Sequence, residues 1–238
     1  MQSLGNPFHI HLLGDHAILI KLSKGLNEGI DQDLLALAAF IKEQKIQGIK
    51  DIILAYDNLT LVYDILDFDS NPYLYVNQLV ANFIAEASNH NAPNSASRLI
   101  EVPVCYDPSL GIDLEAAAKI ANCNIEALIQ EHTAHIYTVY CLGFLPGFAY
   151  MGDVPKKIQL PRHPQPRATV VAGSVGIAGK QTGIYPTDSP GGWQIIGRTP
   201  IKIFDTIKLS LFKAGDQVKF NPIDLALFHE LNNQEDVH

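Results

Sequence analysis

The sequence predicts an α+β protein in two parts: a small α/β sandwich, whose single antiparallel sheet carries both helices on one face, followed by a small β-barrel or β-sandwich. Two observations predict this fold class. Period-2 and helical apolar patterns alternate in the order ββαββα over residues 1–90. Residues 99–238 contain many short apolar runs separated by Gly and Pro turns. The polar residues 91–98 between them are the expected interdomain linker.

The composition is typical of a globular protein and excludes several classes. The chain has 238 residues, of which 47% are hydrophobic and 18% charged, enough for a buried core in each part. A net charge of -8 opposes non-specific binding to nucleic acid, which depends on Lys and Arg. No basic leader with an apolar run is present, and no stretch of about 18 apolar residues. We therefore expect a cytoplasmic protein without a membrane span.

The elements of the first part follow from local patterns. The runs PFHIHLL and HAILIKL flank a Gly-Asp pair and predict a β-hairpin. Apolar residues at helical spacing predict a helix over 31–44. The run DIILAYDNLTLVYDI predicts a second hairpin around Asp57-Asn58, and a second amphipathic helix is expected to begin near Asn71-Pro72.

The second part opens with the strand LIEVPVCY and two helical segments. Asp113 and Asn124 stand where the N-caps of these helices belong. After HIYTVYCLGF the runs stay short and rich in Gly and Pro until NPIDLALFHEL, which predicts a last helical turn or two. The three cysteines include no C-x-x-C pair, a pattern typical of reduced thiols.

The Gly-rich stretch VVAGSVGIAGKQTGIYPTDSPGGWQIIGRTP, residues 170–200, does not match a nucleotide-binding motif. A Walker A alignment on Gly179-Lys180 puts Ser174 in place of the first glycine and Gln181 in place of the magnesium-binding Ser or Thr. A dinucleotide fingerprint fails because no helical pattern follows. A nucleophile elbow around Ser174 fails because it would need glycine where the chain has Ala172.

The spacing of Gly173, Gly176 and Gly179 nevertheless suggests close approach. Without a Cβ, these residues let another backbone or a ligand come near, and freed N–H groups can form an anion-binding concavity. The alternative is that a barrel needs glycine at its tight corners. Both interpretations stay open at this point.

Two further segments carry candidate binding residues. LPRHPQPR holds Arg162 and Arg167 in a proline-framed loop, where a planar guanidinium suits a carboxylate or phosphate; the alternative is two surface arginines. CLGFLPGFAYMG places Phe144, Phe148 and Tyr150 around a Pro-Gly turn, where aromatics either close a barrel end or line an apolar pocket.

The histidines do not predict a metal site. His132 and His135 form H-x-x-H without the glutamate of a zincin or a third ligand, and His9 and His11 supply two ligands at most. His132 is a weak candidate for a general base, because the sequence identifies no partner for it, and it could instead favour the helix C-terminus.

Six ordered segments together resemble one family. EVPVCYDPSLGIDLEAAA, YTVYCLGFLPGFAYMG, PRHPQPR, AGSVGIAGKQTGIYP, SPGGWQIIGRTP and AGDQVKFNP are similar to the KipI family, also called allophanate hydrolase subunit 1 or the B subunit of 5-oxoprolinase. The resemblance runs from about Leu99 to Pro222, with weaker support from LGDHAILIKL. One departure is Val171, where the family usually reads V-P-A-G-S. The resemblance implies an N-terminal α/β domain and a cyclophilin-like β-barrel.

The resemblance also implies a function. It indicates the B subunit of a bacterial ATP-dependent 5-oxoprolinase, a lactam hydrolase that opens 5-oxo-L-proline to L-glutamate with two partners, a KipA-like protein (the C subunit) and a LamB/YcsF-like protein (the A subunit). ATP would act in the assembled complex, and this chain alone would be inactive. The alternative is a KipI-type inhibitor of a sporulation sensor histidine kinase. A urea-carboxylase-related activity also stays open, whereas prolyl isomerase activity would rest on fold alone.

The implied substrate offers a carboxylate and a planar lactam, which need hydrogen-bond donors and apolar walls. The expected substrate-binding residues are Tyr150, Arg162, Arg167, Gly173, Ser174, Gly176, Gly179, Lys180, Gln181, Tyr185 and Trp193.

Overall fold

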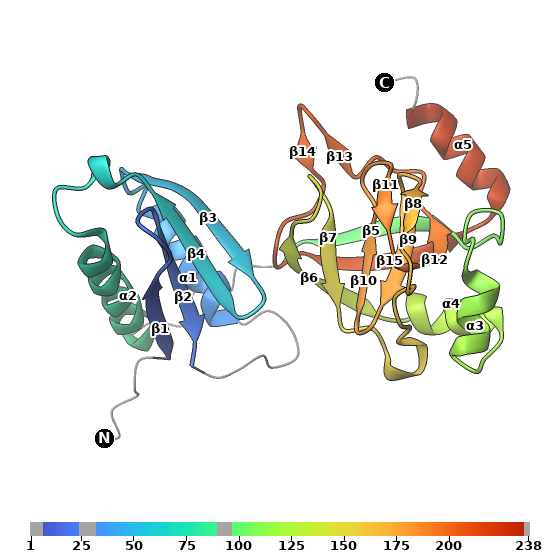
Figure 1. Cartoon of the computed structure of the whole chain (residues 1–238), viewed down its shortest axis with the longest axis horizontal. Coiled ribbons are helices and arrows are strands. Elements are labelled where there is room, and N and C mark those ends of the chain that lie inside the picture. The colour runs from blue at the N-terminus through green and yellow to red at the C-terminus, as the bar shows by residue number, and fades with distance from the viewer. Residues whose placement is uncertain (1–6, 24–31, 90–96, 236–238) are drawn as a thin grey trace. The chain divides into compact units, whose positions relative to one another are not determined.

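A computed structural model describes residues 7–23, 32–89 and 97–235 of the chain (Figure 1). The chain divides into two compact units, residues 1–96 and 97–238. Residues 91–96 of the expected linker lie outside the described residues. Of the helices that the structure describes, none is long and apolar enough to cross a membrane.

The first unit is a four-stranded antiparallel sheet with two long helices. The sheet has the order β1-β2-β4-β3, and the elements follow the predicted order ββαββα. Their bounds are β1 (Phe8–Leu12), β2 (Ala17–Leu22), α1 (Gln32–Glu43), β3 (Ile49–Ala55), β4 (Asn58–Tyr63), a 3-10 turn η1 (Ile65–Asp67) and α2 (Pro72–Asn89).

One core cluster joins the sheet to both helices. The apolar period-2 residues of β2 and the helical-period residues of α1 and α2 meet in it, so one face of the sheet is covered, as predicted. The central members are Ile18, Ile20, Leu34, Leu37, Val76 and Val80. The second hairpin turns at Tyr56-Asp57, one residue before the predicted position, because Asn58 already pairs with Ala55.

The second unit is a closed β-barrel, which confirms the predicted α+β class and decides between barrel and sandwich. Its strands have the order β10-β7-β6-β15-β5-β12-β9. They are β5 (Leu99–Cys105), β6 (Ile136–Leu142), β7 (Ala149–Gly152), β9 (Ser174–Ala178), β10 (Gln181–Ile184), β12 (Gln194–Arg198) and β15 (Gln217–Ile223).

Short elements surround the barrel. Two separate two-stranded sheets pair β8 (Arg167–Val170) with β11 (Ser189–Gly191), and β13 (Phe204–Asp205) with β14 (Leu209–Ser210). The remaining elements are α3 (Leu114–Ile120), α4 (Ile125–Thr133), the 3-10 turn η2 (Lys156–Ile158) and α5 (Leu225–Glu235). Figure 1 shows the β13–β14 hairpin projecting from one rim of the barrel.

Glycines permit the close strand contacts that close the barrel. A Cβ at Gly197 would lie 2.8 Å from the carbonyl oxygen of Cys105, and a Cβ at Gly183 would lie 2.7 Å from that of Ala149. Any larger side chain would push the neighbouring strand away. At these two positions the glycines therefore serve close backbone approach rather than a ligand.

The two expected helix caps differ. Asn124 caps α4, because its side-chain oxygen accepts a hydrogen bond from the Ala127 N–H at 2.8 Å. Asp113 stands at the N-cap position of α3, as predicted, but its side chain makes no capping hydrogen bond. The Asp113 carboxylate instead accepts hydrogen bonds from the Ile195 N–H and from Arg167, because these tertiary donors outcompete the local one.

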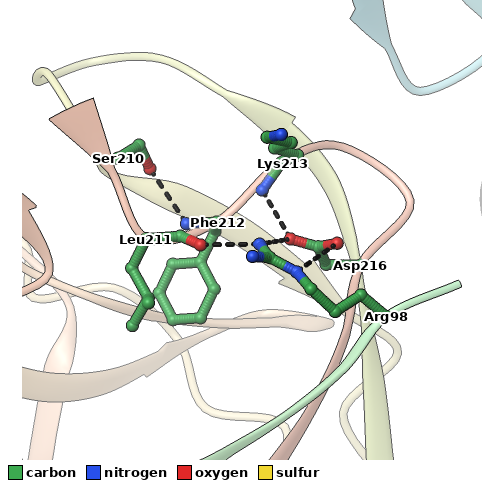
Figure 2. Close-up of polar contacts among 6 residues, drawn as sticks. All are labelled: Arg98, Ser210, Leu211, Phe212, Lys213 and Asp216. Carbon is green, nitrogen blue, oxygen red and sulfur yellow. Dashed lines mark hydrogen bonds and ion pairs between the residues drawn. The ribbon is translucent and has the colours of Figure 1, made fainter. Parts of the chain in front are cut away.

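A polar cluster fastens the start of β5 to the loop before β15 (Figure 2). Nη2 and Nε of Arg98 donate to the buried carboxylate of Asp216 at 2.6 and 3.3 Å, and Nη2 also donates to the Leu211 carbonyl at 2.7 Å. The same carboxylate accepts the Lys213 N–H at 2.7 Å. The Asp216 carboxylate therefore accepts hydrogen bonds from two segments that lie far apart in the sequence.

Replacing Asp216 with alanine is expected to lower the free energy of unfolding of the barrel by about 2 kcal/mol, because charge-assisted bonds to Arg98 and Lys213 are lost. Trp193, the only tryptophan of the chain, lies in the barrel and reports its unfolding in urea. Lys202→Ala is the matched control, since its ion pair with Asp205 is exposed and worth under about 1 kcal/mol. Equal losses in the two variants would contradict this account.

Candidate functional site

Four aromatic side chains pack against one another in a cluster separate from the barrel core. Phe148 contacts Tyr150, Tyr185 and Trp193 with ring centroids 4.8, 5.3 and 5.3 Å apart, and Tyr150 contacts Trp193 at 5.9 Å. All four contacts are edge-to-face, the geometry that aromatic pairs favour. The loop between β6 and β7, strand β7, the residue after β10 and the residue before β12 thus supply one aromatic cluster, in which Phe148, Tyr185 and Trp193 are buried.

Arg162 lies over this aromatic cluster. Its guanidinium carbon is 5.9 Å from the centroid of the Trp193 ring, within the range of a cation–π contact. The segment that carries it is held by hydrogen bonds from the His163 N–H to the Gly192 carbonyl at 2.7 Å and from the Gln194 side chain to the Pro161 carbonyl at 3.0 Å. The proline-framed loop therefore holds the exposed guanidinium of Arg162 against the ring of Trp193.

Tyr150 lies within the electrostatic reach of Arg162, and Tyr185 lies within that of Arg162 and Arg167. Burial raises the pKa of the Tyr150 hydroxyl, and the positive charge of Arg162 opposes that rise. Burial also raises the pKa of the Tyr185 hydroxyl. A hydrogen bond that the hydroxyl accepts from the backbone N–H of Trp193 and the charges of Arg162 and Arg167 oppose that rise. The two arginines and the two tyrosines therefore interact electrostatically with one another. Both tyrosine hydroxyls are neutral near pH 7.

Arg167 is held by an ion pair that the sequence did not reveal. Its Nη2 donates to Oδ1 of Asp113, while Oδ2 of Asp113 accepts the Ile195 N–H at 2.7 Å. Nε2 of His163 lies 3.3 Å from the same Oδ2. That approach is an ion-pair distance without hydrogen-bond geometry, so among the described residues both Nε2 of His163 and Nη1 of Arg167 are buried without a hydrogen bond. Such unsatisfied buried donors are uncommon and call for a specific explanation.

The glycines expected to bind the substrate lie in or beside β9. The Gly173 N–H donates to the Tyr185 carbonyl at 2.7 Å, and the Gly179 N–H donates to the Leu160 carbonyl at 2.6 Å. These two donors are engaged within the barrel, whereas the anion-binding concavity would need them free. Gly176 is buried in β9, between β10 and β12, and Ser174 is buried at the start of that strand.

Lys180 and Gln181 lie at the turn between β9 and β10. Gln181 pairs with Ala178 and with Gly152, and the Lys180 side chain is exposed. β12 begins opposite this end of β9, since Gln194 pairs with Ile177, so Trp193 lies at the same end of the sheet. Lys180 and Gln181 stay predicted ligands of the substrate.

His132 lies in the centre of the barrel core rather than at the aromatic site. Its Nδ1 is 2.8 Å from the Tyr106 hydroxyl, and its Nε2 is 2.9 Å from Oγ1 of Thr182. Because Thr182 donates its own hydroxyl hydrogen to the Gly176 carbonyl, we assign the proton of the ring to Nε2. Burial lowers the pKa of His132 to about 3. As a general base it would first have to break one of these bonds.

The other histidines that the structure describes form no cluster of metal ligands. Nδ1 of His135 is 3.0 Å from the Glu131 carbonyl oxygen, and the rings of His9 and His11 lie side by side on β1. Across the ranges that the structure describes, no three His, Cys, Asp or Glu side chains gather around a common point.

Comparisons with known proteins show the family of this chain. Residues 8–211 match the model of the carboxyltransferase domain, subdomain C and D. The B subunit of 5-oxoprolinase from Bacillus subtilis is 40% identical over 231 residues, covering 93% of this chain and 95% of that protein.

Solved structures are similar as well. The crystal structure of TTHA0988 is 33% identical with a TM-score of 0.72 and covers 87% of this chain, which spans only 40% of that longer chain. The urea amidolyase of Kluyveromyces lactis has a TM-score of 0.71 at 16% identity, covering 97% of this chain and 16% of that enzyme, and so it shares the fold.

Proposed function

The chain belongs to the family of the carboxyltransferase domain, subdomain C and D, and from that premise we propose that it is the B subunit of a bacterial ATP-dependent 5-oxoprolinase. In this proposal it opens 5-oxo-L-proline to L-glutamate together with KipA-like and LamB/YcsF-like subunits, in the cytoplasm. The Bacillus subtilis relative, named as the B subunit of 5-oxoprolinase and matched over 95% of its length, supports this assignment.

The single observation that carries the proposal is the convergence of two arginines on an aromatic cluster. 5-Oxoproline is small and planar, with one carboxylate and one lactam. Arg162 over Trp193 and Arg167 near Tyr185 supply the cations that a carboxylate needs, and the aromatic cluster supplies apolar contacts for the lactam. In this role the chain binds and orients the substrate.

We assign no phosphate chemistry to residues of this chain. ATP supplies the activation of the lactam in the complex, since an unactivated amide resists hydrolysis. The Gly-rich stretch does not fit a phosphate cradle, because the N–H groups of Gly173 and Gly179 already donate within the barrel and β10, not a helix, follows the turn. This chain alone is therefore expected to be inactive.

ATP-dependent release of glutamate from 5-oxoproline tests the proposal. It is measured for this chain alone, for the two partner subunits without it and for the full mixture. Activity only in the full mixture supports a composite enzyme. Turnover by the isolated chain contradicts the composite site, and no activity in any mixture favours the regulatory role, with inhibition of kinase autophosphorylation as the next assay.

An apolar rim beside the site is the surface we assign to a partner protein of the complex. It consists of Phe144, Ile207 and Leu209, whose exposed fractions are 60%, 89% and 63%, on two segments that meet where Gly147 packs against Phe204. Phe144 and Leu209 have φ of +69° and +62°, a strained conformation for large side chains. Phe144 also contacts Phe148 of the aromatic cluster at 5.6 Å, so the rim borders the site. The TTHA0988 chain carries much additional polypeptide beyond the part matched here, and in this proposal a separate protein takes the place of that polypeptide.

Replacing both Phe144 and Leu209 with asparagine is expected to weaken association with the KipA-like partner by about tenfold or more, since buried apolar area is lost. Asparagine tolerates a positive φ, so the barrel should remain folded. The binding is measured by titration calorimetry, with Leu66→Asn, an exposed apolar residue of the first unit, as the control. Unchanged affinity in the double variant would remove the rim from the interface.

A further inference from the structure

The structure assigns a positioning role to Asp113: we propose that its carboxylate fixes the guanidinium of Arg167 so that Nη1 is presented to the carboxylate of the substrate. This inference rests on the proposed function, in which Arg167 binds that carboxylate. It concerns a residue whose position before α3 is typical of a helix cap.

Asp113 is attached to the barrel at two points. Its backbone N–H donates to the Ile195 carbonyl at 2.9 Å, and its Oδ2 accepts the Ile195 N–H at 2.7 Å. Its side chain is only 6% exposed. Ile195 belongs to β12, a strand of the closed barrel, so the carboxylate is fixed relative to the rigid part of the unit.

Arg167 has no comparable backbone support. It lies at the start of β8, which pairs only with the three-residue strand β11 outside the barrel. A long side chain on such a short ribbon has many accessible rotamers. The ion pair from Asp113 removes that freedom by holding one nitrogen of the fork, and orientation of this kind is what a binding site requires.

The second nitrogen of the fork is left without a partner. Nη1 of Arg167 is buried and makes no hydrogen bond with any described residue. A buried charged donor without an acceptor is costly, and a ligand carboxylate would satisfy it with a charge-assisted bond. The local charge fits one anion, because the two guanidinium groups of Arg162 and Arg167 face the single carboxylate of Asp113.

A purely structural ion pair would behave differently from a positioning pair. It would change stability without changing how the enzyme recognises the substrate carboxylate. In a positioning pair, loss of Asp113 acts through Arg167, so the two substitutions are not independent.

The test is a double-mutant cycle on the full complex, with KM and kcat for 5-oxoproline measured at fixed ATP. Asp113→Asn is expected to raise KM about tenfold with kcat within about twofold, because uniform substrate binding is weakened. In an Arg167→Ala background the same change should alter KM less than twofold. Asp51→Asn, an exposed aspartate of the first unit, is the matched control and should leave both constants unchanged.

Each outcome decides the matter. An unchanged KM in Asp113→Asn, or multiplying effects in the double variant, would overturn the positioning role while wild-type turnover keeps the proposed function intact. Absence of wild-type turnover would remove the proposed function and this inference with it. If Asp113→Asn does not fold, Arg167→Lys serves instead: it keeps a charge for Asp113 but lacks the second nitrogen, so a wild-type KM in this variant would overturn the inference.

Discussion

Replacing Arg167 with alanine is expected to raise the KM of the reconstituted complex for 5-oxoproline by about a hundredfold. Truncating one partner of a buried charge pair costs about 2–5 kcal/mol, and each 1.4 kcal/mol is about tenfold in affinity. The rise in KM comes from the lost bond between Nη1 and the substrate carboxylate. The Asp113 carboxylate, left buried without its cation, lowers the stability of the fold instead. Steady-state kinetics of glutamate release with all subunits present measure the effect.

Arg162 provides a graded comparison at the same site. It is exposed and contacts Trp193 through a cation–π interaction, so Arg162→Ala is expected to raise KM by about tenfold or less. Lys156→Ala, an exposed cation on η2, should leave KM unchanged and controls for net charge. If Arg167→Ala behaves like Lys156→Ala, the carboxylate is bound elsewhere and the site proposed here is wrong.

The first unit was predictable because its signals are local. The period-2 runs of β1 and β2 and the helical spacing of α1 each fit within about 12 residues, and neighbouring elements in the sequence also pack together. The single shift, the second hairpin turn, is one residue. Local patterns cannot reveal the parallel pairing of β5 with β15, because it joins residues more than 100 positions apart. That pairing closes the barrel, so the sequence alone left barrel and sandwich as alternatives.

The candidate site was partly visible for the same reason. Proline framing singled out Arg162 and Arg167 within eight residues of sequence, but their anchoring partner Asp113 is 54 positions from Arg167 and has the local signature of a cap. His163 stands between the two arginines in the same segment, yet no local pattern marks a partner for it. The glycine pattern indicated close approach, and at Gly183 and Gly197 the approaching group is backbone.

Acidification is expected to destabilise the barrel through His132. Burial lowers its pKa from 6.5 to about 3 in the folded protein, whereas the unfolded chain takes up the proton near pH 6.5. A group with a depressed folded pKa contributes its stability fully above the unfolded value and loses it as pH falls toward the folded value. Between pH 6 and pH 4.5 the loss attributable to this residue should be about 2 kcal/mol.

The difference between wild type and His132→Gln isolates this contribution from the carboxylates that titrate in the same range. The amide of glutamine can still accept from Tyr106 and donate to Thr182, but it does not ionise. Urea midpoints followed by Trp193 fluorescence at each pH should therefore fall less steeply with acid in His132→Gln than in wild type. His11→Gln, which replaces an exposed histidine of the first unit, should retain the wild-type slope of the barrel. Parallel slopes for wild type and His132→Gln would mean that the imidazole is already charged when the barrel is folded, which its stacking on Phe220 at 4.7 Å inside an apolar core argues against.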